Sequence, residues 1–362
     1  MHATRWTTLL TWRDGGLIRY NAVWQNVAAF FYVGLAQDRT DLGYVTDLVL
    51  FLLFSLAGTA YGYLVNDFAD VELDRRAGKP NVFHGTSRRW AAGVIALAFG
   101  LMLLGGLPFL RRPAFLPLWL LWMLAATFYS LPPLRLKERG AIGLTATILA
   151  QQPLPAAMGF AALGHLQSWG ALLFIAYIAL RGTCSDVGHQ MRDRARDVAA
   201  GATTFAARRS RTTIARLYGL ALELETLGLG AVLLLLLVDL PPVYLDGYAF
   251  AIAWPPLLGY LALLPFTLGR AWRALSAGTW VDPYDESAAG PRRDLFHLMH
   301  QAFPAVGLPL YLASWLTVAY WPNVIFVLWM ALLYRLYDPH RWLAVWPFRL
   351  LTGDRDEPHA HR

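Results

Sequence analysis

Long apolar runs separated by short polar loops dominate the sequence. About 20 consecutive apolar residues are what an α-helix needs to cross a bilayer, and runs of this length recur along the whole chain. Hydrophobic residues make up 57% of the chain and charged residues only 15%, whereas about a quarter of a soluble domain is charged. The sequence therefore predicts an all-α, multi-pass integral membrane protein. The predicted spans are residues 19–37, 44–66, 90–110, 114–131, 142–163, 167–187, 212–238, 247–269, 296–320 and 322–338.

The number of spans is open between nine and ten. Trp321-Pro322-Asn323 separates the last two runs and is compatible with a loop, a kink or a re-entrant turn. We expect one transmembrane domain over residues 19–338, around a central cavity open to lipid. Residues 1–18 are expected to form a cytoplasmic or interfacial segment, and residues 339–362 a cytoplasmic tail.

The distribution of Lys and Arg predicts the orientation. All but three of the 31 Lys and Arg residues fall on one side, in the N-terminus, the loops of that side and the C-terminal segment; the exceptions are Arg39, Arg111 and Arg112. Positive residues concentrate on the cytoplasmic side of membrane proteins. We therefore expect the N-terminus and the loops that follow the second, fourth and sixth runs to be cytoplasmic. The same asymmetry explains the net charge of +7 without a nucleic-acid partner.

Carboxylates cluster where the second run ends. Asp67, Asp70 and Asp74 follow Asn66 at spacings of three and four residues, so they share one face of a helix. Acids at membrane depth are costly, and like charges on one face repel one another. A divalent cation removes the repulsion, and Mg²⁺ usually takes one or two carboxylates together with phosphate oxygens. The pattern favours a metal–phosphate site over a solvated helix end.

A second acidic pair follows the sixth run. Asp193 and Asp197 lie four residues apart, and Asp186, His189 and Gln190 extend the same helical face back into the membrane. The alternative is surface pairing of both acids with neighbouring arginines. The two clusters emerge on the same side, four spans apart, which suggests two related four-helix halves around a shared cavity. Two Mg²⁺ ions between them would clamp a diphosphate.

Basic residues near the acids suit the same ligand. Lys79 and Lys137 are the only lysines of the chain, and Pro132-Pro133 stiffens the turn that leads to Arg135 and Lys137. Arg binds phosphate oxygens as a fork and Lys as a point charge. The alternative role of these residues is to enforce the positive-inside topology.

Polar and aromatic side chains within the spans are candidates for substrate contact. Intramembrane polar groups usually face the interior of a bundle, where they bind substrate or join helices by hydrogen bonds. Aromatic rings there would stabilise a carbocation, although each ring also suits core or lipid packing. The polar candidates are Asn21, Asn26, Gln151, Gln152, His189 and Gln190, and the aromatic ones are Phe54, Tyr61, Tyr63, Phe128 and Tyr129.

These motifs together resemble the UbiA superfamily of intramembrane prenyltransferases. Asn66-Asp67-x-x-Asp70-x-x-x-Asp74 resembles its first aspartate-rich signature, and Asp193-x-x-x-Asp197, followed by Gly201 and Thr203, resembles its second. The segment Tyr129-Ser130-x-Pro132-Pro133-x-Arg135-x-Lys137 resembles the one between its fourth and fifth spans. The resemblance covers about residues 15–320. Two departures are Lys79, where many members have arginine, and Gln190, where many have an acid. The second leaves fewer ligands for the second metal unless Asp186 contributes.

The resemblance implies a helical bundle in which Mg²⁺ bridges the acidic motifs and the diphosphate of a polyprenyl donor. The donor would ionise to an allylic cation that an aromatic or other lipophilic acceptor captures in the cavity. From the resemblance and the intramembrane polar groups together, we expect the catalytic residues Asp70, Asp193, Lys79 and Lys137; the metal ligands Asn66, Asp70, Asp74, Asp193 and Asp197; and the substrate-binding residues Asn66, Arg135, Tyr129, Gln151, Gln152, His189, Gln190 and Asn21.

Other functions remain open for such a site. The same residues would serve cyclisation of the donor, as in a UbiA-type terpene cyclase, or transfer of a phosphorylated sugar. A different class is a transporter or lipid-binding membrane protein whose acids bind cations without catalysis.

Overall fold

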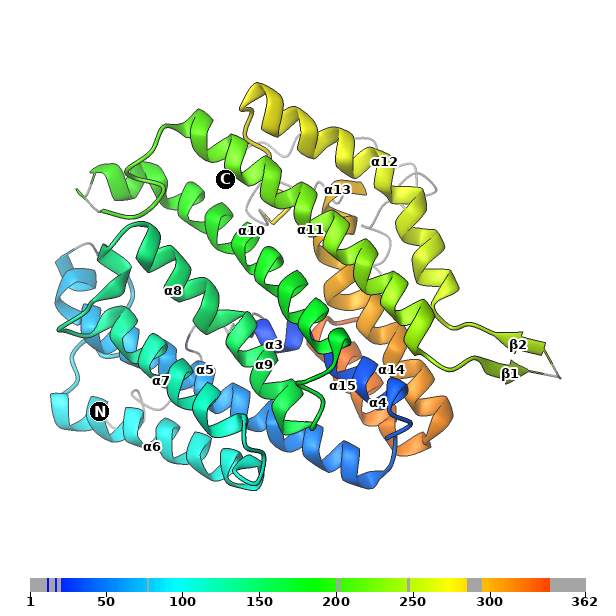
Figure 1. The fold of residues 1–362 in the computed structure, drawn as a ribbon. Coiled ribbons are helices and arrows are strands. Elements are labelled where there is room, and N and C mark those ends of the chain that lie inside the picture. Colours follow the sequence, from blue (N-terminus) through cyan, green and yellow to red (C-terminus); the bar gives the residue numbers. More distant parts are fainter. Residues whose placement is uncertain are drawn as a thin grey trace.

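The computed structural model forms one helical bundle, in agreement with the predicted fold class (Figure 1). The predicted terminal segments 1–18 and 339–362 lie outside the described residues, apart from Trp12 and Leu17. The structure describes Trp12, Leu17 and residues 21–76, 78–199, 201, 203–245, 248–284 and 295–338.

Each predicted span contains helix. Five helices of the described part are long and apolar enough to cross a membrane. The other runs form shorter or interrupted helices, apart from that of α12, which has 24 residues. The elements of the first half are α3 (Ala22–Gln25), α4 (Ala28–Ala36), α5 (Leu42–Arg76), α6 (Arg88–Gly106), η2 (Leu107–Phe109), α7 (Phe115–Ser130), η3 (Leu136–Glu138), α8 (Ala141–Gln151) and α9 (Pro153–Ala162). Those of the second half are α10 (Trp169–Ala199), α11 (Arg211–Asp239), β1 (Val243–Leu245), β2 (Tyr248–Phe250), α12 (Trp254–Ala277), α13 (Leu295–His297), η4 (Leu298–Gly307), α14 (Leu308–Ala319), η5 (Trp321–Asn323) and α15 (Val324–Leu333).

The helices α5 and α10 are longer than the predicted spans. They have 35 and 31 residues, which at 1.5 Å per residue gives about 52 and 46 Å, well beyond the roughly 30 Å hydrocarbon core. The helices therefore continue past residues 66 and 187, where the predicted spans end. Shortly after each helix a glycine adopts a left-handed conformation, Gly78 with φ 66° and Gly201 with φ 68°, which suits a helix C-terminus. Both acidic motifs consequently lie on rigid helix.

Two of the spans are broken, and the breaks contact each other. The first is interrupted between α3 and α4, and the fifth between α8 and α9, where Gln152 has non-helical backbone angles ahead of Pro153. Asn26 Nδ2 donates to Gln152 Oε1 at 2.9 Å, and both side chains are buried. This hydrogen bond gives each of the two buried side chains a polar partner at the helix breaks.

The eighth span begins later than predicted. Residues 248–250 form strand β2, which pairs antiparallel with β1, and helix begins only at Trp254. The hairpin projects from the end of the bundle opposite the acidic motifs (Figure 1). Pro255 and Pro256 suit this start, because the first turn of a helix does not need the backbone N–H that proline lacks.

The segment Trp321-Pro322-Asn323 forms the tight turn η5 between α14 and α15. Asn323 is fully buried, and its Nδ2 donates to the carbonyl oxygens of Thr40, Leu316 and Tyr320 at 2.8–3.2 Å. One side chain thus satisfies three backbone groups at the turn.

A buried polar cluster joins α10, α11, the loop after α12 and η4. Glu225 is 1% exposed; Tyr284 donates its hydroxyl to Glu225 Oε1 at 2.5 Å, and His300 Nδ1 lies 3.0 Å from Oε2. Arg181, which the sequence analysis counted with the basic loops, is instead 2% exposed within α10. The contacts of Glu225 on α11 therefore connect this helix to the loop after α12 and to η4.

We expect Glu225→Gln to lower the stability of the bundle by about 1–3 kcal/mol, because the variant removes the charge from both hydrogen bonds and places an amide donor against existing donors. The thermal unfolding midpoint of the detergent-solubilised protein measures the effect. Glu223→Gln, two residues away and partly exposed, is the control. Equal midpoints for the two variants would contradict the role of Glu225.

Candidate active site

The first acidic motif is built around an ion pair. Asn66, Asp70 and Asp74 lie on one face of α5, four residues apart. Asp70 is only 8% exposed, and Lys137 Nζ lies 2.5 Å from each of its carboxylate oxygens. Arg135 Nη2 lies 3.4 Å from Oδ1. Two cations from the loop between α7 and α8 therefore compensate a buried acid.

The other residues of this motif have neutral partners. Asn66 Oδ1 accepts a hydrogen bond from Ser130 at 2.7 Å, and Asp74 Oδ2 accepts one from Asn81 Nδ2 at 2.8 Å. Asp67 accepts from Trp12 Nε1 at 3.0 Å. Ser130 and Asn81 are site residues that the sequence analysis did not single out.

The position of Lys137 depends on close packing of η3 on α8. Arg135, just before η3, has a left-handed backbone with φ 40°. Gly143 on α8 faces η3 so closely that a Cβ there would lie 2.4 Å from the carbonyl oxygen of Leu136. Only glycine permits this approach, and the approach fixes the lysine beside Asp70.

The second acidic motif has local partners. Asp193 forms an ion pair with Arg196, and His189 Nε2 lies 3.6 Å from its other oxygen. Asp197 accepts a hydrogen bond from Thr204 Oγ1 at 3.0 Å. The surface pairing that the sequence left open is therefore present at Asp193.

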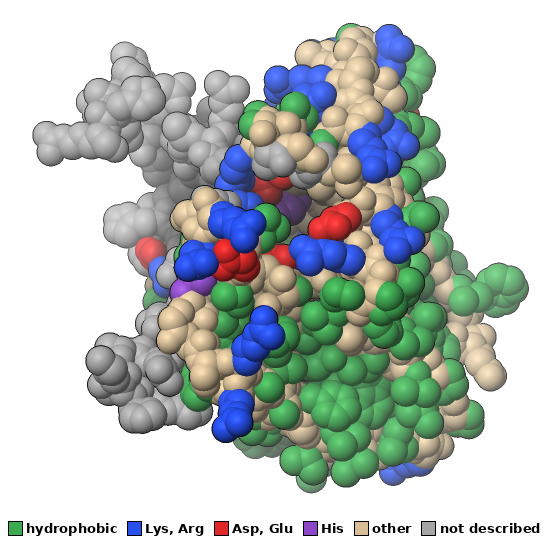
Figure 2. All heavy atoms as spheres, turned by 90° about the vertical axis from the view of Figure 1, so that its left-hand side faces the viewer, with side chains coloured by type: hydrophobic (Ala, Val, Ile, Leu, Met, Phe, Trp, Pro, Cys, Tyr) green, Lys and Arg blue, Asp and Glu red, His purple; other side chains and the backbone are tan. Residues whose placement is uncertain are grey.

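The loop that carries Lys137 also contacts the end of α10. Thr203 donates its hydroxyl to Glu138 O at 2.5 Å, and Gly140 forms an isolated parallel bridge with Thr204. Both acidic motifs are thereby held at one end of the bundle. Figure 2 shows this end, where Lys and Arg side chains surround acidic ones above a hydrophobic surface.

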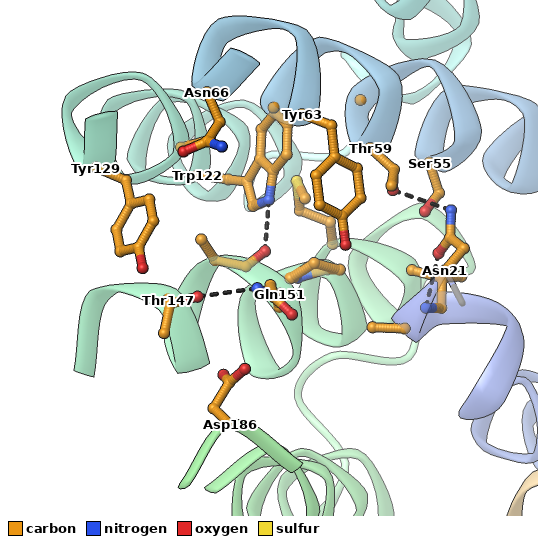
Figure 3. Close-up of a pocket in the computed structure, with 18 of the residues that line it drawn as sticks. Asn21, Ser55, Thr59, Tyr63, Asn66, Trp122, Tyr129, Thr147, Gln151 and Asp186 are labelled. Carbon is orange, nitrogen blue, oxygen red and sulfur yellow. Dashed lines mark hydrogen bonds between the residues drawn. The ribbon is translucent and has the colours of Figure 1, made fainter. Parts of the chain in front are cut away.

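A cavity of about 360 Å³ lies inside this end of the bundle (Figure 3). Asn66 and Lys137 line its polar part, while Phe51, fifteen residues before Asn66 on α5, lines its apolar part. At 1.5 Å per residue these ends are about 22 Å apart along the helix. Of the sequence candidates, the lining includes Asn21, Phe54, Tyr63, Asn66, Tyr129, Lys137, Gln151, His189 and Gln190.

Some candidates lie elsewhere. Gln152 is hydrogen-bonded to Asn26 and does not line the cavity, so the structure gives it the helix-joining role. Lys79 lies on the exposed turn after α5 and is likewise not among the lining residues. Tyr61 is hydrogen-bonded to Thr127. No sequence pattern pointed to the polar lining residues Ser55, Thr59 and Thr147.

The cavity has polar groups along its length. Asn21 donates Nδ2 to Thr59 Oγ1 at 2.9 Å, and Gln151 donates Nε2 to Thr147 Oγ1 at 2.9 Å. Trp122 Nε1 donates to the carbonyl oxygen of Ala150 at 2.7 Å. These bonds orient side chains from α3, α5, α7 and α8 around one space (Figure 3).

The oxygen ligands for a metal are present but not assembled into one shell. Within the described residues there is no group of three His, Cys, Asp or Glu side chains close enough to hold a metal ion. Mg²⁺ needs only one or two carboxylates when phosphate oxygens and water complete its shell. The metal-ligating roles of Asn66, Asp70, Asp74, Asp193 and Asp197 stay predictions.

The comparisons with known proteins decide the family. The family model described as the UbiA prenyltransferase family matches residues 27–279, which include both acidic motifs and the loop between α7 and α8. The chain belongs to the UbiA prenyltransferase family. The resemblance inferred from the sequence motifs is confirmed.

Two further findings concern relatives of this UbiA family member. A solved structure of a UbiA homolog from Archaeoglobus fulgidus, bound to DMAPP and Mg²⁺, aligns with 88% of this chain and 98% of its own at a TM-score of 0.49 and 13% sequence identity. The search of curated proteins found no significant match.

Family membership fixes the general class of the protein. Together with five long apolar helices, it identifies a multi-pass membrane protein, and it makes prenyl transfer the general reaction class. The cavity lined at its polar part by Lys137, which pairs with Asp70, is the candidate active site of this family member.

The two lysines provide a test of the site. We expect Lys137→Met to lower the rate of diphosphate release from a prenyl diphosphate by about 10²-fold or more, since removal of one preorganised charge-stabilising group typically costs this much. Lys79→Met, matched in size and chemistry, should change the rate by less than about threefold. Release of labelled diphosphate by the purified protein measures both. Equal losses in the two variants would restore Lys79 to the site, and no loss in either would remove Lys137 from it.

Proposed function

We propose that the protein catalyses Mg²⁺-dependent transfer of a prenyl group from a polyprenyl diphosphate to an aromatic or other lipophilic acceptor within the membrane. One observation carries the proposal: an apolar cavity has a buried Lys137–Asp70 pair at its polar end, and both acidic motifs lie at that same end of the bundle. A prenyl diphosphate has the same division into an apolar tail and a charged head.

The residues at the polar end fit Mg²⁺. Asn66, Asp70 and Asp74 on α5 and Asp193 and Asp197 on α10 offer only oxygen atoms, which this hard cation prefers. The first three would hold one ion and the last two a second. When bound, Mg²⁺ stabilises the negative charge of the diphosphate as a Lewis acid.

The protein's own cations serve the leaving group. Breaking the carbon–oxygen bond of the donor leaves a new negative charge on the diphosphate, and charges placed beforehand stabilise it most effectively. Lys137 supplies a point charge and Arg135 a planar fork. Asp70 lies within 3.4 Å of both cations and holds them at the polar end of the cavity.

The remainder of the cavity protects and guides the allylic cation. Water must be excluded until the acceptor reacts, and Phe51, Phe54 and Met102 provide an apolar lining. The faces of Tyr63 and Trp122, which also line the cavity, stabilise a cation within about 6 Å of a ring centre. An acceptor beside these rings captures the cation.

We also propose that the acidic end of the bundle faces the cytoplasm. The three Arg residues that break the positive-inside pattern lie at the other end, where Arg39 and Arg111 both pair with Asp47 near the start of α5, at 3.5 and 3.6 Å. The loops at the acidic end carry most of the remaining cations.

Single cysteines test this orientation. In a Cys184→Ser background, which removes the one native cysteine, Tyr244→Cys on the exposed hairpin should react with a membrane-impermeant maleimide in intact cells. Lys79→Cys, at the acidic end, should react only after permeabilisation. The opposite labelling pattern would reverse the proposed orientation.

The acidic motifs test the proposed reaction. We expect Asp70→Asn and Asp193→Asn each to lower diphosphate release by roughly 10²–10³-fold, and EDTA to abolish release until Mg²⁺ is restored. Release from labelled dimethylallyl diphosphate and longer prenyl diphosphates, with chromatography of the products, measures both. Glu72→Gln is the control, because Glu72 pairs only with Arg75 and Arg76 at the surface.

Two outcomes would contradict the proposal. Undiminished release in both aspartate variants would show that the acidic motifs do not act in the reaction. A cyclic hydrocarbon formed without incorporation of any acceptor would show that the protein is a cyclase and not a transferase.

A further inference from the structure

One acid of the cavity takes no part in the arrangement described above. Asp186 on α10 is the one Asp or Glu among the residues that line the cavity in the described structure. It precedes Asp193 by seven residues, two helical turns, so it lies about 10 Å deeper along the helix.

Asp186 also lacks a partner. Its Oδ2 is buried without a hydrogen bond, and no side chain of the described residues forms an ion pair with it. The acids of both motifs, in contrast, each accept a hydrogen bond or form an ion pair. An uncompensated carboxylate inside a membrane protein is costly and is a mark of function.

The surroundings of Asp186 define what would compensate it. In Figure 3 its carboxylate points from α10 towards Thr147 and Gln151 on α8, across the cavity from Asn66 and Tyr63 on α5. Gln151 donates its amide N–H to Thr147, which leaves its carbonyl oxygen free to accept. The ammonium group of Lys137, which also lines the cavity, is already paired with Asp70. The Asp186 carboxylate and the Gln151 carbonyl oxygen are therefore acceptors without a partner among the described residues, and a ligand that supplies an O–H or N–H group matches them.

We propose that Asp186 binds the prenyl acceptor through a hydroxyl or amine group and excludes acceptors that present a carboxylate there. This inference rests on the proposed prenyl transfer, because it assigns the acceptor's end of the same cavity. A hydroxyl group on an aromatic ring satisfies the carboxylate while the ring packs on the apolar lining. A carboxylate in its place meets like charge in a setting of low polarity, where repulsion is strong.

The experiment compares two probes of equal tail length, 4-hexylphenol and 4-hexylbenzoate, on the full-length protein in detergent. Native mass spectrometry measures the affinity of each probe. The wild type should bind the phenol at least about tenfold more tightly than the benzoate. Asp186→Asn should weaken phenol binding by about tenfold, as expected for loss of a hydrogen bond to a charged group. The ratio of the affinities for the phenol and the benzoate should also fall in this variant. Glu223→Gln, outside the cavity lining, should behave as the wild type.

A second measurement separates acceptor binding from metal binding and from misfolding. The Mg²⁺ concentration for half-maximal binding of dimethylallyl diphosphate should stay the same in Asp186→Asn and rise in Asp193→Asn. A rise in Asp186→Asn would make Asp186 a metal ligand and overturn the inference, as would equal affinity of the wild type for the two probes.

The outcomes also separate this inference from the proposed function. Phenol binding that depends on Asp186, in a protein that never releases diphosphate, supports the hydroxyl site and refutes prenyl transfer. Diphosphate release with no discrimination between the probes supports prenyl transfer and refutes the role of Asp186.

Discussion

The interaction on which the site depends is the buried ion pair between Asp70 and Lys137. A lone charge at this depth would lose its hydration without compensation, whereas a close pair repays part of that cost. The pair joins the end of α5 to the loop between α7 and α8. Through Glu138 and Thr203 the same loop reaches the end of α10. One compensated charge thus links the three segments that carry the family's motifs.

The lengths of α5 and α10 determine where the two acidic motifs lie. Because α5 and α10 continue well past the thickness of the hydrocarbon core, their acidic ends remain helical and rigid. A helix holds Asn66, Asp70 and Asp74 on one face, which a flexible loop would not do. The cavity then joins charged groups at that end to apolar and aromatic groups deeper in the bundle, and this division matches the chemistry of ionising a lipid diphosphate.

The acids of the protein divide into compensated and uncompensated groups, and the division has functional meaning. Asp70, Asp74, Asp193 and Asp197 each have a partner that a metal or a diphosphate would replace or share. Glu225 has permanent partners in Tyr284 and His300 and serves packing. Asp186 alone among the cavity-lining residues presents a carboxylate with no partner in the described structure. In the proposed function, the partners of each acid, more than its acidity, separate the donor site, the scaffold and the acceptor site.

The sequence by itself determined the class of the protein and the location of its acids. Apolar length, the asymmetry of Lys and Arg, and the spacing of acids such as Asp70 and Asp74 are local properties, which a chain shows before it folds. Only the tertiary structure decided that Lys137 faces the cavity while Lys79 does not, that Gln151 lines it while Gln152 joins two helix breaks, and that Asp186 is left without a partner. Neighbouring residues of like type differ in this way because the direction of a side chain follows from helix phase and packing, which depend on contacts distant in sequence.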